Sequence, residues 1–173
     1  MSKGEIQIFD NVVSAHDRNE IYAAARYSKF SIGWGDNNIL ENQQYQFLAA
    51  RFADEKRTPL VERVFLNGQL KETLEGLVAT KSFVHLATPS DSFFMHTHDE
   101  YKVLLYYVNP VWQDGWHGDT VFYEDNCKDI RFCSPYTPGR CILFDGCIPH
   151  SLRPQSVIGP KFRFSLVTFF ERK

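Results

Sequence analysis

The spacing of hydrophobic and polar residues changes near residue 82. In the first 80 residues, many apolar positions recur at intervals of three or four, which is the spacing of an amphipathic helix. Ser14 followed by Asp17 predicts a helix start, and the pattern carries this helix through Tyr27. Further helices are predicted over residues 40–53, from Pro59 onward, and over residues 70–77.

After residue 82, short apolar runs alternate with turn-rich segments such as T-P-S-D and S-P-Y-T-P-G. This pattern is typical of β-strands joined by tight turns. The predicted strands cover residues 83–87, 93–98, 102–108, 120–123, 129–134, 140–144 and 162–170. Helices followed by strands favour an α+β fold, and the short strands fit a jelly roll with N-terminal buttressing helices. We expect one domain over residues 1–173, with residues 1–80 as mainly helical support and residues 81–173 as the β-barrel core.

Composition changes this picture little. The chain has 173 residues, of which 43% are hydrophobic and 23% are charged, so it is an ordinary globular protein. Aromatic residues make up 15%, which fits either a lined cavity or simply a bulky core. The net charge of -2 supports no binding to nucleic acid or to an anionic membrane.

The location of the protein is predicted from segments that it lacks. No apolar run approaches the roughly 20 residues of a transmembrane helix. Residues 1–10 lack the basic start and apolar stretch of a signal peptide, so a cytoplasmic protein is expected. In a reducing cytosol, its four cysteines are expected to be free thiols, because their spacing suits a zinc site poorly: Cys127, Cys133, Cys141 and Cys147.

Candidate metal ligands lie in two distant segments. On a strand, His96 and His98 would point to the same side, and Glu100 would join them if the strand continued, whereas Asp99 would face away. His150 follows the L-F-D-G turn in a later segment. A histidine and acid cluster with one distant histidine can supply three metal ligands and leave coordination positions open. The leading hypothesis is therefore metal-dependent oxidation.

Arg163 and Ser165 lie on one face of the last predicted strand. A buried arginine needs an anion, which is either a bound carboxylate or an internal acidic residue. Trp112 and Trp116 flank a glycine-containing turn, where they would either roof a pocket and contact the substrate or cap the barrel end. The remaining histidines lack a supporting pattern and are predicted to be structural or surface residues: His16, His85 and His117.

Several ordered segments between residues 83 and 171 carry a family resemblance: H-T-H, L-L-Y-Y-V-N-P-V-W, W-H-G-D-T-V-F-Y, P-G-R-C-I-L-F-D-G-C-I-P-H and R-F-S. Together they resemble the Fe(II)- and 2-oxoglutarate-dependent oxygenase superfamily, in its prolyl-4-hydroxylase-like branch. The resemblance implies a double-stranded β-helix that binds Fe(II), 2-oxoglutarate and O2. It carries the distant iron ligand over to His150 and the 2-oxoglutarate-binding R-x-S to Arg163 and Ser165. We select Tyr106 and Asn109 as further co-substrate contacts.

The sequence departs from the family at its H-x-D/E motif. Without a gap, the motif falls on His96 and His98, which places a histidine where the family has an acid. A shift of two residues makes it His98 and Glu100. The first register is favoured, because the second leaves almost no turn before the strand at Lys102. The acid ligand would then be absent or supplied from elsewhere, and Asp99 and Glu100 stay open as alternatives.

The resemblance implies a hydroxylase that couples decarboxylation of 2-oxoglutarate to oxidation of an unidentified substrate. Protein prolyl residues, free amino acids and small metabolites all remain possible substrates. One alternative is a cupin-like three-histidine metal dioxygenase that does not use 2-oxoglutarate, and this alternative leaves Arg163 without a ligand. A second alternative is a non-enzymatic jelly-roll module that uses its aromatic residues to bind a sugar or peptide.

Overall fold

The computed structural model describes residues 4–34, 47–91 and 94–173. Its helices are α1 (Ala15–Arg26) and α2 (Arg57–Val61), and a π-helical turn, η2 (Glu62–Leu66), continues α2. The strands are β1 (Ile6–Phe9), β2 (Ser31–Trp34), β3 (Phe47–Arg51), β4 (Leu77–Ala87), β5 (Lys102–Tyr107), β6 (Thr120–Tyr123), β7 (Ile130–Ser134), β8 (Cys141–Asp145), β9 (His150–Leu152) and β10 (Arg163–Arg172).

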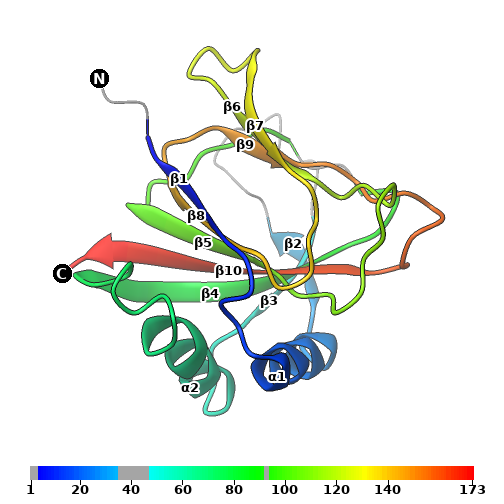
Figure 1. Ribbon diagram of the computed structural model, residues 1–173. Helices are drawn as coiled ribbons and strands as arrows, with labels where there is room; N and C mark the ends of the chain where they lie inside the picture. Colours follow the sequence, from blue (N-terminus) through cyan, green and yellow to red (C-terminus); the bar gives the residue numbers. More distant parts are fainter. Residues whose placement is uncertain (1–3, 35–46, 92–93) are drawn as a thin grey trace.

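The strands form two antiparallel sheets. The main sheet has seven strands in the order β1-β8-β5-β10-β4-β3-β2, and the minor sheet has three in the order β7-β6-β9. In Figure 1 the minor sheet lies above the main sheet, and both helices lie below it. This arrangement is a jelly roll with helices on its outer face, which confirms the predicted fold class.

Alternation along the central strand β5 builds a separate core on each side of the main sheet. Val103, Leu105 and Tyr107 are buried in the core between the two sheets. Leu104 and Tyr106 are buried in the core between the main sheet and the helices. Because successive side chains on a strand point to opposite faces, one sequence run fills both cores.

Helix α1 forms as the sequence predicts. Ser14 is its N-cap, with the Ser14 hydroxyl accepting a hydrogen bond from the Asp17 backbone N–H at 3.1 Å. Ile21 and Ala25 are fully buried on the face that packs against the sheet. Helix α2 begins at Arg57, two residues before the predicted Pro59 start.

Two predicted helices are wrong over the residues that the structure describes. Phe47–Arg51 forms strand β3 instead of the end of a helix, and the rest of that predicted helix lies outside the described residues. The segment before β4 forms turns rather than a helix over residues 70–77, and it closes at Gly76, whose φ is +79°. The first 80 residues therefore add strands β1, β2 and β3 to the main sheet.

The later strands follow the prediction more closely, and β6 does so at both ends. The predicted strand at residues 93–98 is wrong over its described part, where a single bridge joins His96 to His150. Strands β1 and β9 were not predicted. All four cysteines are free, with Cys141 buried in β8.

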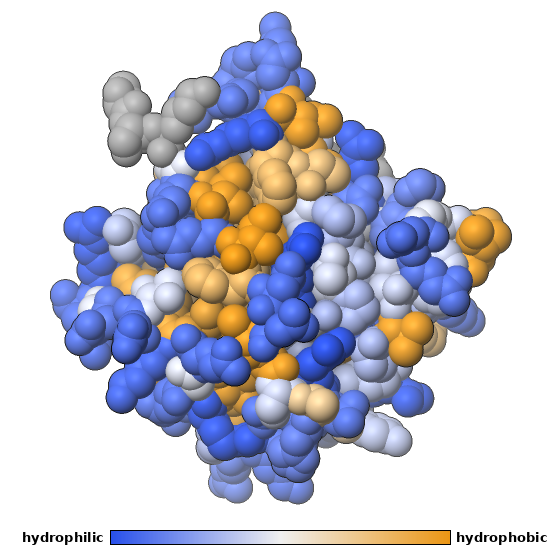
Figure 2. Space-filling model, in the orientation of Figure 1, coloured by the Kyte–Doolittle hydropathy of each residue, from blue (hydrophilic) through white to orange (hydrophobic). Residues whose placement is uncertain are grey.

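The described surface is largely hydrophilic on the face drawn in Figure 2, and apolar residues show between the polar ones along the line of β1. Ile8 on this strand is 39% exposed. Within the described ranges, the helices are all too short or too polar to cross a membrane.

Candidate metal and co-substrate site

His96 and His150 are held side by side by their own backbones. The N–H of each donates to the carbonyl oxygen of the other at 3.0 Å, although the two residues are 54 positions apart in the chain. Strand β9 begins at His150, and the chain crosses it at His96 without forming a longer strand. This reciprocal pair fixes the spacing of the two imidazoles independently of any bound ligand.

His98 is placed by the turn after β8. Its backbone N–H donates to the carbonyl oxygen of Gly146 at 2.8 Å. A Cβ atom on Gly146 would lie 2.0 Å from the carbonyl oxygen of Glu100 and 3.1 Å from that of His98. Only a glycine lets the two turns approach this closely, so Gly146 sets the position of the His98 backbone.

The three histidines form one cluster. One ring nitrogen from each of His96, His98 and His150 lies within 4.8 Å of the other two. The ring centroids are 4.3 Å apart for His96 and His150, 4.8 Å for His96 and His98, and 5.0 Å for His98 and His150. Small side-chain movements would bring three nitrogens onto one metal ion.

Hydrogen bonds orient two of these rings. Nδ1 of His96 lies 3.0 Å from the Phe94 carbonyl oxygen, and Nδ1 of His150 lies 2.9 Å from the Ile148 carbonyl oxygen. A carbonyl only accepts, so each Nδ1 carries the proton and Nε2 of the neutral ring keeps its lone pair. That tautomer is the one a metal-binding histidine needs.

Burial keeps two of the clustered histidines, His98 and His150, uncharged. Burial, reinforced by the neighbouring His96, lowers the pKa of His98 to about 3. Burial also lowers the pKa of His150 well below its ordinary value, with further contributions from His96 and His98. Both imidazoles are therefore uncharged at neutral pH and able to coordinate a cation.

The acidic residues next to His98 are not part of the cluster. Glu100 forms an ion pair with Lys81 of β4, and its side chain is 15% exposed. Asp99 is exposed. Of the two motif registers, the one with His96 and His98 therefore places both of its residues in the cluster. The described residues add no carboxylate to this cluster.

Arg163 is fully buried at the start of β10. Its Nε donates to the Gly118 carbonyl oxygen at 3.0 Å, and its Nη1 lies 3.4 Å from Oγ of Ser165. Its Nη2 is buried with no hydrogen-bond partner in the described structure. The alternative, an ion pair with an internal acidic residue, is not seen among the described residues, although the charge of Asp119 acts on the guanidinium through space.

Aromatic rings enclose the guanidinium. Its central carbon lies 4.7 Å from the ring centroid of Tyr136 and 5.6 Å from that of Tyr107. Burial lowers the pKa of Arg163, an effect that these two tyrosines partly oppose. A buried cation with an unused donor is able to accept an anionic partner.

The two tryptophans lie at the arginine end of the barrel. Trp112 packs against Tyr136 with ring centroids 4.2 Å apart, and Trp116 packs edge-on against Trp112 at 5.7 Å. Gly118 has a φ of +83°, and a Cβ there would lie 3.1 Å from the Arg163 Nε and 3.2 Å from the Trp112 ring. Of the two expected roles, this placement favours capping the barrel end over contacting a substrate beside the histidines.

Neither Tyr106 nor Asn109 is among the described residues that line the cavity around the histidines. Tyr106 lies on the helix side of β5, where it packs edge-on against Phe65 at 5.4 Å. The side-chain oxygen of Asn109 accepts from the Phe164 N–H at 2.7 Å, and its amide donates to the Phe162 carbonyl at 3.0 Å. Asn109 therefore braces the start of β10, and the contact of these two residues with the co-substrate stays a prediction.

Tyr107 and Tyr136, rather than Tyr106, lie beside the Arg163 guanidinium. The Tyr107 hydroxyl donates to Thr120 at 2.9 Å, and the Tyr136 hydroxyl donates to the Phe164 carbonyl at 2.6 Å. Tyr107 was adjacent to the chosen residue in the sequence. Tyr136 lies in a turn, where no pattern in the sequence indicates a role.

His85, predicted to be structural, faces the histidine cluster. It lies opposite Ser165 in the β4–β10 pairing, and its proximity contributes to the lowered pKa of His98. It lines one narrow cavity together with the three clustered histidines, Ser165 and five apolar residues: Val103, Leu105, Phe144, Leu152 and Val167. Strand β4 was predicted, but its pairing with β10 was not visible from spacing alone.

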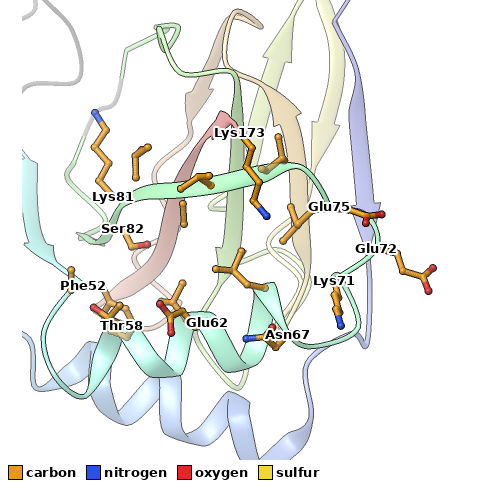
Figure 3. Close-up of a pocket in the computed structure, with 18 residues that line it drawn as sticks. Phe52, Thr58, Glu62, Asn67, Lys71, Glu72, Glu75, Lys81, Ser82 and Lys173 are labelled. Atoms are coloured by element: carbon orange, nitrogen blue, oxygen red, sulfur yellow. The ribbon is translucent and has the colours of Figure 1, made fainter.

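A second cavity, of about 580 Å³, lies on the helix side of the main sheet between η2 and β4. Figure 3 shows it walled by apolar residues and by both acidic and basic side chains, among them Glu62, Glu72, Lys71 and Lys173. It contains no histidine among its described lining residues, so it is separate from the cluster.

No protein-family model and no curated protein matches the sequence. Solved structures do match. A Trichoplax adhaerens prolyl hydroxylase in complex with a hypoxia inducible factor oxygen degradation domain peptide has a TM-score of 0.74 at 15% identity, over 96% of this chain and 83% of that one. A Pseudomonas putida prolyl-4-hydroxylase has a TM-score of 0.74 at 14% identity, over 98% and 94%.

Another match is HygX from Streptomyces hygroscopicus with nickel, 2-oxoglutarate and hygromycin B bound, which has a TM-score of 0.67 at 10% identity, over 98% of this chain and 84% of that one. At such identities the likeness establishes a shared fold. The double-stranded β-helix that the sequence motifs implied is therefore confirmed.

Proposed function

We propose that this protein is a non-haem Fe(II) oxygenase that uses 2-oxoglutarate and O2 to oxidise an organic substrate. The observation that carries the proposal is one barrel that holds both a cluster of three histidines and a buried arginine with an unused donor. Two prolyl hydroxylases and a 2-oxoglutarate-binding protein share the fold.

The described residues fit an iron ion. His96, His98 and His150 present their ring nitrogens within 4.8 Å of one another. Imidazole suits iron, nickel, copper and zinc, so the chemistry of the donors accepts Fe(II) without excluding its neighbours. Three protein ligands leave open positions for a co-substrate and O2.

Arg163 and Ser165 fit the far carboxylate of 2-oxoglutarate. The planar guanidinium can hold a carboxylate through two parallel hydrogen bonds, and Nη2 is the donor left for this role. We assign the neighbouring contact to Tyr107, which lies opposite Ser165 in the β5–β10 pairing. Binding of the anion would satisfy a buried charge that the described protein leaves unpaired.

The iron and the co-substrate would supply the oxidising chemistry, and the protein supplies orientation and a dry site. Val103, Leu105 and Val167 line the cavity with apolar side chains that exclude water. The paired backbones of His96 and His150 keep two ligands in place throughout the reaction.

The substrate is proposed to be a peptide or a small molecule. Among the structural relatives, the Trichoplax enzyme is complexed with a peptide, and HygX with hygromycin B. A prolyl residue, a free amino acid and a small metabolite all suit the scaffold. We also propose a cytoplasmic protein that binds neither nucleic acid nor membrane, on the basis of its composition and charge.

A cupin-like metal dioxygenase that needs no 2-oxoglutarate is the second candidate. The three-histidine cluster favours it, because the family motif has an acid at the position of His98. The buried, unpaired Nη2 of Arg163 favours the first candidate, since the second assigns that group no partner.

An anaerobic titration tests the proposal. Apo-protein receives Fe(II), then 2-oxoglutarate, while the visible absorption of the combined complex is recorded. His150→Ala removes a clustered histidine, and His16→Ala removes a histidine whose side chain is 77% exposed on α1. We expect a band that requires both additions, persists in His16→Ala and disappears in His150→Ala.

The other outcomes of the titration would support different functions. Iron binding with no 2-oxoglutarate-dependent band would support the cupin-like dioxygenase. Absence of iron binding would leave a binding module and refute the oxygenase proposal.

A further inference from the structure

Strand β4 extends beyond the strand that covers its outer edge. Its eleven residues run alongside β10 on one side. On the other side, β3 pairs only with residues 83–86, and a final hydrogen bond joins the Phe52 N–H to the Ser82 carbonyl oxygen at 2.8 Å. The chain then leaves β4 and enters α2. Among the described strands, β10 is therefore the only one that pairs with residues 77–81.

The outer edge of residues 77–81 offers backbone groups to another chain. An antiparallel strand directs its N–H and C=O groups alternately to its two edges, so about half of these groups point outward. Such a free edge is a template for strand pairing, and proteins often block it with proline or with charged residues. Residues 77–80 include neither. Lys81 is charged, but it forms an ion pair with Glu100 and points away from the cavity between β4 and η2 (Figure 3).

That cavity, of about 580 Å³, opens beside the free edge. Figure 3 shows β4 above it and α2 with η2 below it. Val61, Leu66 and Leu74 supply apolar lining from below, and Val78, which is 44% exposed, supplies it from the strand. The volume falls within the range of about 300–1,000 Å³ that is typical of ligand pockets. A chain bound here would meet backbone groups on one side and apolar side chains on the other.

One basic side chain is directed into this cavity. The Lys173 N–H donates to the Gly76 carbonyl oxygen at 2.9 Å, which places Lys173 beside the start of β4, and its side chain points toward η2 in Figure 3. Lys173 forms no ion pair with a described residue. Glu72 and Glu75 point away from the cavity in the same view, whereas Glu62 lies on the far wall. An acidic group is therefore the favoured partner at the Lys173 end.

We propose that the groove between β4 and η2 binds an extended peptide segment of another protein, which pairs with residues 77–81 as an additional strand. Apolar side chains of the peptide enter the cavity, and an acidic residue pairs with Lys173. In this mode the backbone hydrogen bonds supply affinity and the side-chain contacts supply selectivity. A second copy of this chain would bring its own α2 and η2, and helices about 10–12 Å across do not fit a cavity of this size. The groove lies across the main sheet from the histidine cluster, so this surface is additional to the proposed oxygenase site.

The test uses the full chain and a capped peptide with the sequence Asp-Val-Thr-Val-Thr-Val. One control peptide begins with lysine instead, and a second is N-methylated at every residue and has no backbone N–H to donate. By calorimetry we expect the lysine peptide to bind at least about 3-fold more weakly and the methylated peptide at least about 10-fold more weakly. Hydrogen exchange with mass spectrometry locates the peptide. At about nine times its Kd, exchange of the outward amides of residues 77–81 should slow about 10-fold.

Variants of the protein test the edge and the charge separately. Val78→Lys places a long charged side chain at the free edge and should weaken peptide binding at least about 10-fold. Ile130→Lys is the matched control, because Ile130 is 53% exposed on β7 of the minor sheet and does not line the cavity, so it should bind the peptide as the wild type does. Lys173→Glu should reverse the preference between the peptides that begin with aspartate and lysine.

Several results would overturn the proposal. The wild type should bind the first peptide, and absence of binding refutes the docking surface. Equal binding of the methylated peptide, or slowed exchange only outside residues 77–81, refutes strand pairing. If the free protein sediments as a dimer and Val78→Lys makes it a monomer, the edge holds a second copy instead. Urea unfolding shows whether Val78→Lys is folded; if it is not, the methylated peptide and Lys173→Glu decide the question.

Discussion

Replacement of Arg163 by methionine should abolish most of the stabilisation that 2-oxoglutarate gives to the protein. Methionine has a similar length and no charge, so the variant removes the cation while largely filling its space. The guanidinium is fully buried, and its Nη2 has no partner in the described structure. The apo-protein loses the hydrogen bonds to Gly118 and Ser165. The bound state loses in addition its interaction with the carboxylate, so the comparison with and without 2-oxoglutarate isolates that interaction.

The size of the effect follows from the hydrogen bonds. One hydrogen bond to a charged group contributes about 1.5–3 kcal/mol, and the upper part of this range corresponds to roughly 100-fold in affinity. At a co-substrate concentration of about 100 times the wild-type Kd, binding stabilises the wild type by about 2.7 kcal/mol. The same concentration would equal the Kd of the variant, where the stabilisation falls to about 0.4 kcal/mol.

Urea unfolding of Ni(II)-loaded protein, with and without 2-oxoglutarate, measures this difference. Arg153→Met is the matched control, because Arg153 is exposed near the same end of the barrel. We expect the control to keep the full stabilisation. If Arg163→Met is stabilised as strongly as the wild type, the guanidinium does not bind the co-substrate and the reasoning from its unpaired donor is wrong.

Three further predictions concern the cluster and the fold. Gly146→Ala should weaken Ni(II) binding at least about 10-fold by calorimetry, because its Cβ would lie 2.0 Å from the Glu100 carbonyl oxygen. Gly115→Ala strains the backbone at a φ of +85° but meets no neighbouring atom within 4 Å, so it should leave Ni(II) binding unchanged. The pKa values of His98 and His150 are lowered in the folded protein, so as the pH falls these two residues become protonated only in the unfolded chain. Acidification from pH 7.5 to 5.5 should therefore lower apo-protein stability by about 2.7 kcal/mol, and a double His98→Asn, His150→Asn variant that loses as much would contradict this. Ser14→Ala should lower stability by about 1 kcal/mol in urea unfolding through loss of the α1 cap, and should leave metal binding unchanged.

Short sequence patterns correctly predicted the elements whose structure depends only on neighbouring residues. The cap at Ser14 and the alternating run of β6 are complete within a few neighbouring residues, and both appear in the structure as expected. The arginine and serine of the last strand could be placed on one face because side chains two positions apart on a strand share a face. The three histidines were identified from residue type and spacing.

Elements that depend on distant partners could not be read in this way. Strand β1 has four residues and pairs with β8, so its register joins Ile6 to Phe144. Strand β3 has a sequence compatible with a helix, and pairing with β4 makes it extended. The predicted helix at residues 70–77 had apolar residues at suitable spacing, but the chain turns there and enters β4 at Leu77. Tertiary context outweighs propensity in such short segments.

The choice between Tyr106 and Tyr107 shows the same limit at the scale of one residue. Either tyrosine could contact a co-substrate, and a strand sends them to opposite faces. Which face is the barrel interior depends on the register with β10, where Tyr107 lies opposite Ser165. A slip of one residue reverses every side chain on the strand, so type and order alone cannot decide between adjacent tyrosines. The histidine register has a similar origin, because the reciprocal bridge to His150 selects His96 from 54 residues away. Residue type therefore indicated the chemistry that we propose for this site, and long-range pairing determined which neighbouring side chains lie together there.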